Sequence, residues 1–188
     1  MRPLLLFYLC LVSALAAAAA DPTPYPTTPS PKGLQVQMVD DLLELGVHHA
    51  GINLTLNGLL SPAKEAKPGQ PTAKADGFTF VINEAYAKSL DRQIKALSDK
   101  GIVVTAILIT YRSPNERIRA LTVHPQADPV KGTTMAANTV TPEGRACYAA
   151  LTDFIARRWC SADTSHGRLW GWVISNEVNS HHEWHQMG

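Results

Sequence analysis

The chain has 188 residues, with 17 basic and 16 acidic side chains, so its charge is nearly balanced at pH 7. No segment forms the basic stripe that nucleic-acid-binding proteins carry, and we therefore do not expect nucleic acid as a partner. The length suits one ordinary domain rather than several.

Residues 1–20 have the composition of a secretory signal peptide. Arg2 provides the positive start, residues 4–15 form an apolar centre, and an alanine run reaches Ala20. A retained membrane anchor is the alternative, but no second hydrophobic stretch follows. We expect a secreted or periplasmic protein with no stable membrane insertion after cleavage. Residues 21–31 alternate Pro with Thr and Ser, which predicts an extended linker, and the folded domain is expected at 32–188.

Helical and strand-like patterns alternate along that domain. The predicted order is a helix at 34–45, a strand at 47–56, a helix at 84–100, a strand at 102–109, a helix at 143–159 and a strand at 168–175. Gly46 and Gly101 end the first two helices, whereas 61–77 and 111–141 lack periodicity and are expected to be long loops.

Strands that alternate with helices predict an α/β fold with a parallel sheet and right-handed crossovers. The run at 102–109 is apolar throughout and rich in β-branched residues, as is typical of a strand buried on both faces. Long loops follow the strands, and the turns that precede the strands are short. A functional site is therefore expected at the C-terminal edge of the sheet.

Two cysteines, Cys147 and Cys160, lie beyond the signal peptide. They are thirteen residues apart on one predicted helix, which separates them by about 20 Å at 1.5 Å per residue. A disulfide requires Cα atoms within about 7 Å, so we do not expect these cysteines to form a disulfide with each other.

Glu177 is the first candidate catalytic residue, because it follows the predicted strand at 168–175 directly. A carboxylic acid at a strand end, with its proton affinity raised by an enclosed aromatic pocket, can act as a general acid/base. Asn176 beside it could bind a substrate hydroxyl. The alternative is a surface glutamate paired with an arginine, since the Asn83-Glu84 pair of the same chain simply starts a helix.

A cluster rich in histidine follows at residues 181–185. Its expected role is a rim for sugar rings and hydroxyls beside Glu177, and the residues assigned to it are Asn179, His181, His182 and Trp184. One alternative is a polar loop without function. Another is a zinc site on His181 and His185, but Gln186 stands where the His-Glu-x-x-His pattern requires histidine.

Polar residues also follow the other predicted strands: Asn53, Asn57, Tyr111, Arg112, His124 and Asn138. We assign substrate binding to Asn53, Tyr111 and Arg112. Arg112 could neutralise a carboxylate at the mouth of the site, or it could be structural and pair with a loop acid. The chain has no Gly-rich phosphate loop and no Gly-x-Ser-x-Gly motif, so no nucleotide, other cofactor or serine-hydrolase chemistry is expected.

Several segments resemble a bacterial family of unknown function that is related to the clan A glycoside hydrolases. They are residues 32–38, 80–86, 89–94, 138–144 and 175–180. The resemblance covers about residues 32–188. It implies a (β/α)8 barrel in which 32–36 forms the first strand, 47–56 the second, 102–109 the third, and the strand before Asn176-Glu177 the fourth.

The resemblance also implies roles for two residues. Glu177 would be the acid/base of a retaining hydrolase of O-glycosidic bonds, and Asn176 would contact the carbohydrate substrate. The nucleophile of such enzymes is a glutamate after the seventh strand, for which this chain has no counterpart. We therefore expect the N-terminal half of a barrel, inactive without a missing C-terminal half-barrel. A non-catalytic carbohydrate-binding barrel and a zinc hydrolase remain alternatives.

Overall fold

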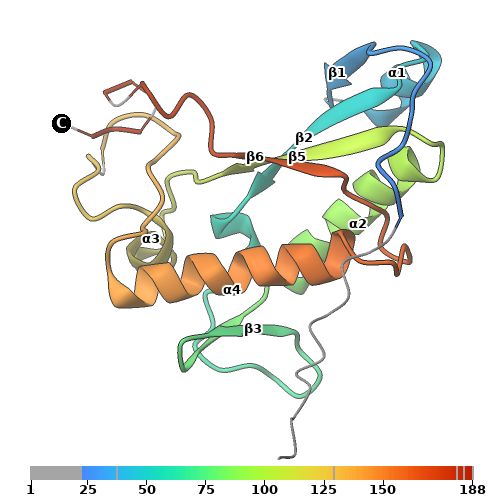
Figure 1. Cartoon of the computed structure of the whole chain (residues 1–188). Helices are drawn as coiled ribbons and strands as arrows, with labels where there is room; N and C mark the ends of the chain where they lie inside the picture. The colour runs from blue at the N-terminus through green and yellow to red at the C-terminus, as the bar shows by residue number, and fades with distance from the viewer. Residues whose placement is uncertain (1–22, 37, 129, 181, 184, 188) are drawn as a thin grey trace, which may run out of the picture.

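The computed structural model describes residues 23–36, 38–128, 130–180, 182, 183 and 185–187. Its centre is a parallel sheet of four strands, in the order β1 (Gly33–Gln35), β2 (His49–Thr55), β5 (Val103–Ile109) and β6 (Gly171–Ile174) (Figure 1). The α/β class and the parallel sheet are thus confirmed. The described strands do not close into a barrel.

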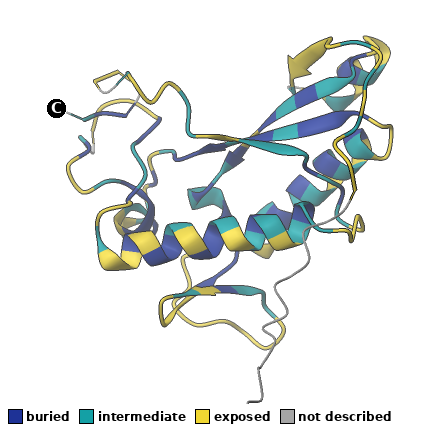
Figure 2. Cartoon of the chain, viewed as in Figure 1, coloured by how far each residue is buried: buried dark blue, intermediate teal, exposed yellow. Residues whose placement is uncertain are grey.

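Two long helices cover one face of this sheet (Figures 1 and 2). In α2 (Glu84–Ser98), the Asn83 side chain accepts the Tyr86 N–H, and in α4 (Pro142–Trp159), the Thr141 hydroxyl accepts the Gly144 N–H. Both caps satisfy a main-chain donor that the first helical turn leaves unpaired. A short helix, α1 (Val39–Glu44), joins β1 to β2.

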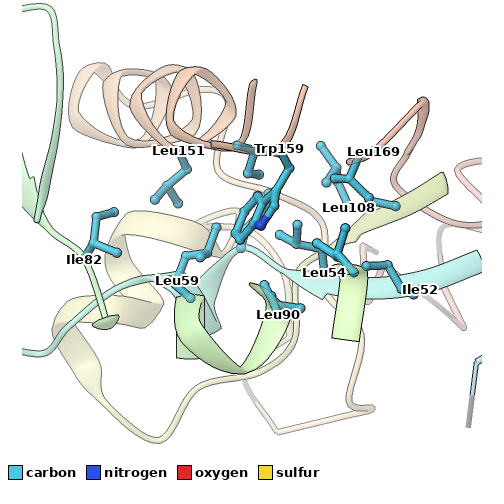
Figure 3. Close-up of a cluster of buried hydrophobic side chains, with 14 of the residues drawn as sticks. Ile52, Leu54, Leu59, Ile82, Leu90, Leu108, Leu151, Trp159 and Leu169 are labelled. Carbon is cyan, nitrogen blue, oxygen red and sulfur yellow. The ribbon is translucent and has the colours of Figure 1, made fainter. Parts of the chain in front are cut away.

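The hydrophobic core lies between the sheet and these helices (Figure 3). Alternate side chains of β2 and β5, including Ile52, Leu54 and Leu108, face Leu90 of α2 and Trp159 of α4, and all are buried. Burial of such apolar area is the main stabilising contribution to a domain of this size. The core therefore fixes the strands whose ends carry the candidate site.

The opposite face of the sheet is open in the part of the chain that the structure describes. Asn53 is exposed there, and Val173 of β6 has 46% of its surface accessible. Gln35, His49 and Thr105 line a shallow hollow of about 250 Å³ on this face. The sheet thus has one packed face and one accessible face that mixes polar and apolar groups.

A β-hairpin occupies part of the segment that was predicted to be a loop at 61–77. Strands β3 (Thr72–Ala75) and β4 (Phe78–Val81) pair in antiparallel fashion, and the hairpin packs against α4. Asp76 and Gly77 both have positive φ, 49° and 81°, as a two-residue type I′ turn requires. The loop prediction was wrong here: the Asp76-Gly77 pair is the sequence signal of a two-residue hairpin turn.

Further elements differ from the order predicted from the sequence. Residues 34–45 are not one helix, because Leu34 belongs to β1 and only Val39–Glu44 is helical; the resemblance, which implied a strand at 32–36, was the better guide. The loop predicted at 111–141 contains α3 (Glu116–Thr122), and a 3-10 turn, η1 (Asn57–Leu59), follows β2. The glycine-terminated helix ends at Gly46 and Gly101 are confirmed by φ values of 60° and 75°.

The N-terminal predictions fall mostly outside the described residues. The signal peptide at 1–20 lies there entirely, and the linker is described only from Thr23, where it forms no helix or strand up to Pro31. No helix in the described ranges is long and apolar enough to cross a membrane.

Cys147 and Cys160 are both free thiols, as the helical spacing predicted. Burial in the core raises the pKa of Cys147 from 9.0 to about 12, against a smaller opposing effect of Arg117, and burial also raises the pKa of Cys160. A buried neutral thiol is a poor nucleophile. Cys147 is therefore a core residue and not a catalytic one.

The raised pKa of Cys147 predicts a loss of stability in alkali. The folded protein keeps this proton up to about pH 12, whereas the unfolded chain releases it above about pH 9, so stability falls as pH rises through that range. In this range Cys147 lowers the free energy of unfolding by about 1.4 kcal/mol for each pH unit. Cys147→Ala should flatten the decline of the free energy of unfolding between pH 8.5 and 10.5, measured by urea titration. Parallel curves for the two proteins would contradict this assignment.

Candidate functional site

Side chains from β1, β2 and the segment after β5 form a hydrogen-bonded line on the open face of the sheet, toward its C-terminal edge. The Gln35 amide, at the end of β1, donates to Asn53 Oδ1 on β2 at 2.9 Å. Asn53 Nδ2 in turn lies 3.4 Å from the Tyr111 hydroxyl, just beyond β5. All of these groups are at least partly accessible. The strand-end prediction thus correctly brought Asn53 and Tyr111 together, and it missed Gln35.

Asn57 has a structural role at the same edge. Its side-chain oxygen accepts the Tyr111 main-chain N–H at 3.0 Å, which ties the turn after β2 to the end of β5. The Tyr86 hydroxyl bonds both the main-chain N–H and the hydroxyl of Thr55, and Gly58 leaves room for it, since a Cβ there would lie 2.9 Å from the Tyr86 ring. These contacts hold the polar line in place.

Glu177 lies at the same edge, three residues after β6. Ser175 and Glu177 both have positive φ, 66° and 47°, and the Glu177 carbonyl accepts the Ser180 N–H at 2.8 Å, so the chain turns sharply here. Non-glycine residues in this conformation are uncommon and often occur at functional sites. The Glu177 side chain is exposed, so the described residues do not form the enclosed aromatic pocket that was expected around it.

His185 holds the segment that carries Glu177. Its imidazole is buried, and Nε2 lies 2.9 Å from the main-chain oxygen of Asn176. Because a carbonyl can only accept, this ring nitrogen must donate. The main chain of His185 also donates to Ser180 and accepts from Ala136. His185 is thus a positioning residue for Asn176-Glu177.

The histidine cluster is only partly described. Asn179 and His182, two and five residues after Glu177, are exposed, whereas His181 and Trp184, which were assigned to substrate binding, lie outside the described residues. The described residues contain no group of three or more His, Cys, Asp or Glu side chains placed to hold a metal ion. The imidazole of His185, one of the two ligands considered for zinc, already donates to a carbonyl.

A long loop packs beside the C-terminal segment (Figure 1). Ala127 forms a β-bridge with Met187, and the Asp128 N–H donates to the Gln186 carbonyl. Val123, Ala127 and Met135 form a small apolar cluster with Met187. The same loop also bridges to the end of β5 through Tyr111 and Thr134. It therefore joins the ends of β5 and β6 into one loop cluster.

The remaining predicted polar residues have different surroundings. Asn138 is buried, and its side chain bonds Ala120 O, Thr141 Oγ1 and two main-chain N–H groups before α4, so it is structural. His124 Nδ1 accepts the Gln126 N–H. Arg112 donates to the Val130 carbonyl and forms no ion pair with a described acid, so the alternative of a structural pairing with a loop acid is not found among the described residues.

Comparisons with known proteins identify the chain at the level of a family. No curated protein and no solved structure matches it. One family model, described as a family of unknown function (DUF5722), matches residues 24–188. That range includes all four strands of the sheet and the Asn176-Glu177 turn. The chain therefore belongs to this family of unknown function, DUF5722.

Proposed function

We propose that this protein is part of a retaining glycoside hydrolase in which Glu177 is the acid/base. One observation carries the proposal: Asn176-Glu177 directly follows a parallel strand, at the same sheet edge as the accessible amides and hydroxyl of Gln35, Asn53 and Tyr111. Catalytic residues of parallel α/β barrels occupy this edge. Neutral hydrogen-bonding groups of this kind suit sugar hydroxyls, which both donate and accept.

The proposed chemistry assigns two proton transfers to one side chain. Glu177 protonates the glycosidic oxygen as the bond to the anomeric carbon breaks, and it then removes a proton from the water that releases the sugar. The exposed position of Glu177 gives a substrate access to the carboxyl group. Asn176 and Asn53 would orient ring hydroxyls beside it.

A retaining mechanism needs a second carboxylate about 5 Å from the first. Gln35 of β1, Asn53 of β2 and Tyr111 beyond β5, which lie toward this edge on the accessible face, are uncharged. We propose that a second half-barrel supplies the nucleophile and completes the sheet beyond β6.

The exposed side of β6 supports this completion. Ile174 pairs in register with the buried Leu108 on the helix-covered face, yet 55% of its surface is accessible. Beside it, an apolar cavity of about 700 Å³ lies against α4 and is lined by Ala156 and Trp172. In a barrel, the helix that follows this strand would pack there and bury Ile174.

A non-catalytic carbohydrate-binding barrel is the second candidate. The open, polar face around Gln35 and Asn53 could hold a sugar whether or not a bond is broken. The two functions differ in one measurement, because only the hydrolase releases a new reducing end.

The deciding experiment is an assay of the complete protein on a panel of oligosaccharides, followed by proton NMR of the anomeric signals. We expect hydrolysis in which the first product keeps the anomeric configuration of the substrate. Inverted product would contradict the two-step mechanism. Binding without turnover, seen by titration calorimetry with the same sugars, would establish the carbohydrate-binding alternative instead.

A further inference from the structure

A cavity of about 570 Å³ beside the loop cluster is lined by two arginines. Arg112 follows β5 and Arg119 belongs to α3, and the other lining residues are Ser113, Pro114 and Val130. The two guanidinium groups therefore reach one cavity from separate elements. Like charges brought to one cavity repel each other unless an anion lies between them.

No described acid neutralises either arginine. Other arginines of the chain have carboxylate partners, as Arg157 has Asp153 and Arg158 has Asp91, but no ion pair in the described ranges involves Arg112 or Arg119. Glu116 lines the neighbouring cavity, which Arg119 also borders, without pairing with it.

Asp128, two residues before Val130 on the loop, already has partners in its own turn. Its carboxylate accepts the main-chain N–H groups of Val130 and Lys131, which keep its pKa below the ordinary value. It also lies 3.8 Å from the Lys131 ammonium group. Asp128 therefore stabilises its own turn and leaves the charge of the arginine pair uncompensated.

Each arginine is held by a main-chain carbonyl. Arg112 Nη1 donates to the Val130 oxygen, and Arg119 Nη1 donates to the Ser113 oxygen at 3.2 Å. A guanidinium has five N–H donors and no acceptor, so one such bond leaves four donors on each side chain. Donors in this fork geometry bind carboxylate and sulfate oxygens strongly.

The cavity belongs to the same loop cluster as Glu177. The loop that binds Arg112 through Val130 also binds the C-terminal segment, since Asp128 donates to Gln186 and Ala136 donates to His185. His185 in turn holds Asn176. A substrate bound at Glu177 could therefore extend toward the arginines.

We propose that Arg112 and Arg119 form a subsite for an anionic sugar substituent, either the carboxylate of a uronic acid or a sulfate ester. This inference deepens the proposed function, on which it rests, by naming the substrate class as an acidic glycan. The neutral amides of Gln35 and Asn53 would bind hydroxyls, and the arginine pair would select for charge.

The test is a ¹⁵N–¹H NMR titration of the complete protein with four probes at constant low ionic strength: D-glucuronate, D-glucose 6-sulfate, D-glucose and inorganic sulfate. We expect both acidic sugars to shift the amide signals of residues 112, 113, 119 and 130, with dissociation constants at least about 10-fold below that of glucose. The tighter acidic sugar identifies the substituent. Binding should weaken as salt is added, because exposed charges are screened.

Arg112→Gln and Arg119→Gln should each weaken binding of the acidic sugars by about 10-fold or more. The matched control is Arg117→Gln, since Arg117 lies on the same helix and donates to the Ala63 carbonyl but does not line the cavity. Circular dichroism checks that each variant folds. If a glutamine variant does not fold, the corresponding lysine variant, which keeps the charge but loses the fork, should show weaker binding than the control.

Three outcomes would overturn the subsite: equal affinity for glucose and the acidic sugars, inorganic sulfate bound as tightly as the sulfated sugar, or no effect of the arginine variants. Failure of the subsite is separable from failure of the proposed function. Glu177-dependent hydrolysis of neutral glycans without anion binding would refute only the subsite. Arginine-dependent binding of acidic sugars without hydrolysis would refute only the enzymatic function.

Discussion

Replacing Trp159 with alanine is expected to lower the free energy of unfolding by about 3–5 kcal/mol, the usual cost of truncating a large buried aromatic side chain. Trp159 has no accessible surface and stands at the end of α4, with its ring edge-on to Phe154. Its indole N–H donates to Asp91 of α2 at 3.0 Å. The substitution therefore leaves a cavity and removes one of the donors that hold this carboxylate.

The effect should extend to β6. The Trp159 carbonyl accepts the Leu169 N–H, and Trp170 then bonds Val104 of β5, so the end of α4 sets where the strand before Glu177 begins. Urea unfolding monitored by far-UV circular dichroism measures the change. Trp159→Phe is the control, because it keeps most of the apolar volume and loses the N–H donor; we expect it to cost about 1.5–3 kcal/mol. A loss below 1 kcal/mol for Trp159→Ala would contradict this account of the core.

Elements with a strong periodic pattern could be predicted from the sequence. In α2 the spacing of Leu90, Ile94 and Leu97 matches the buried face of the helix. The apolar run of β5 matches a central strand whose helix-facing side chains are buried, although Thr105 and Ile107 on the open face are only partly covered. Short elements could not be predicted in this way. The helix α3 has seven residues and β1 has three, too few for a periodic pattern, so packing against the rest of the chain decides their structure.

Part of the candidate site also followed from the sequence. In a parallel sheet, the C-terminal parts of the strands lie toward one edge, which is why the sequence places Asn53 and Tyr111 on the same side of the sheet. The role of His185 could not, because its ring bonds a main-chain carbonyl nine residues earlier in a turn without periodicity. The approach of Arg119 to Arg112 depends on how α3 folds back, and the sequence shows no pattern for that.

The loop after β5 contacts both features that the sequence did not predict, the arginine pair and the segment of His185. Its main chain binds Arg112 on one side and the segment of His185 on the other. A change in this loop would therefore move the arginine pair and the Glu177 turn together. The segment without periodicity thus determines the geometry of the site, while the periodic elements provide its support.

Replacing Glu177 with glutamine is expected to reduce kcat/KM of the complete protein on alkyl or oligosaccharide glycosides by about 10²–10⁴-fold, the usual contribution of a general acid/base. The amide keeps the size of the side chain but cannot donate an acidic proton to the leaving oxygen. The loss should depend on the leaving group. An aryl glycoside whose phenol leaves without protonation, such as a 2,4-dinitrophenyl glycoside, should form the glycosyl-enzyme at nearly the original rate, which burst kinetics measure.

This dependence on the leaving group distinguishes an acid/base from a residue that only supports the fold, because structural damage slows all substrates alike. The matched control is Glu183→Gln, an exposed carboxylate on the same segment, which should leave turnover unchanged. Equal losses on alkyl and dinitrophenyl substrates would remove Glu177 from the acid/base role. A second line of evidence comes from Glu177→Ala with added azide. This small anion can attack the glycosyl-enzyme without base assistance, so a glycosyl azide of retained configuration should form only if Glu177 normally deprotonates the incoming water.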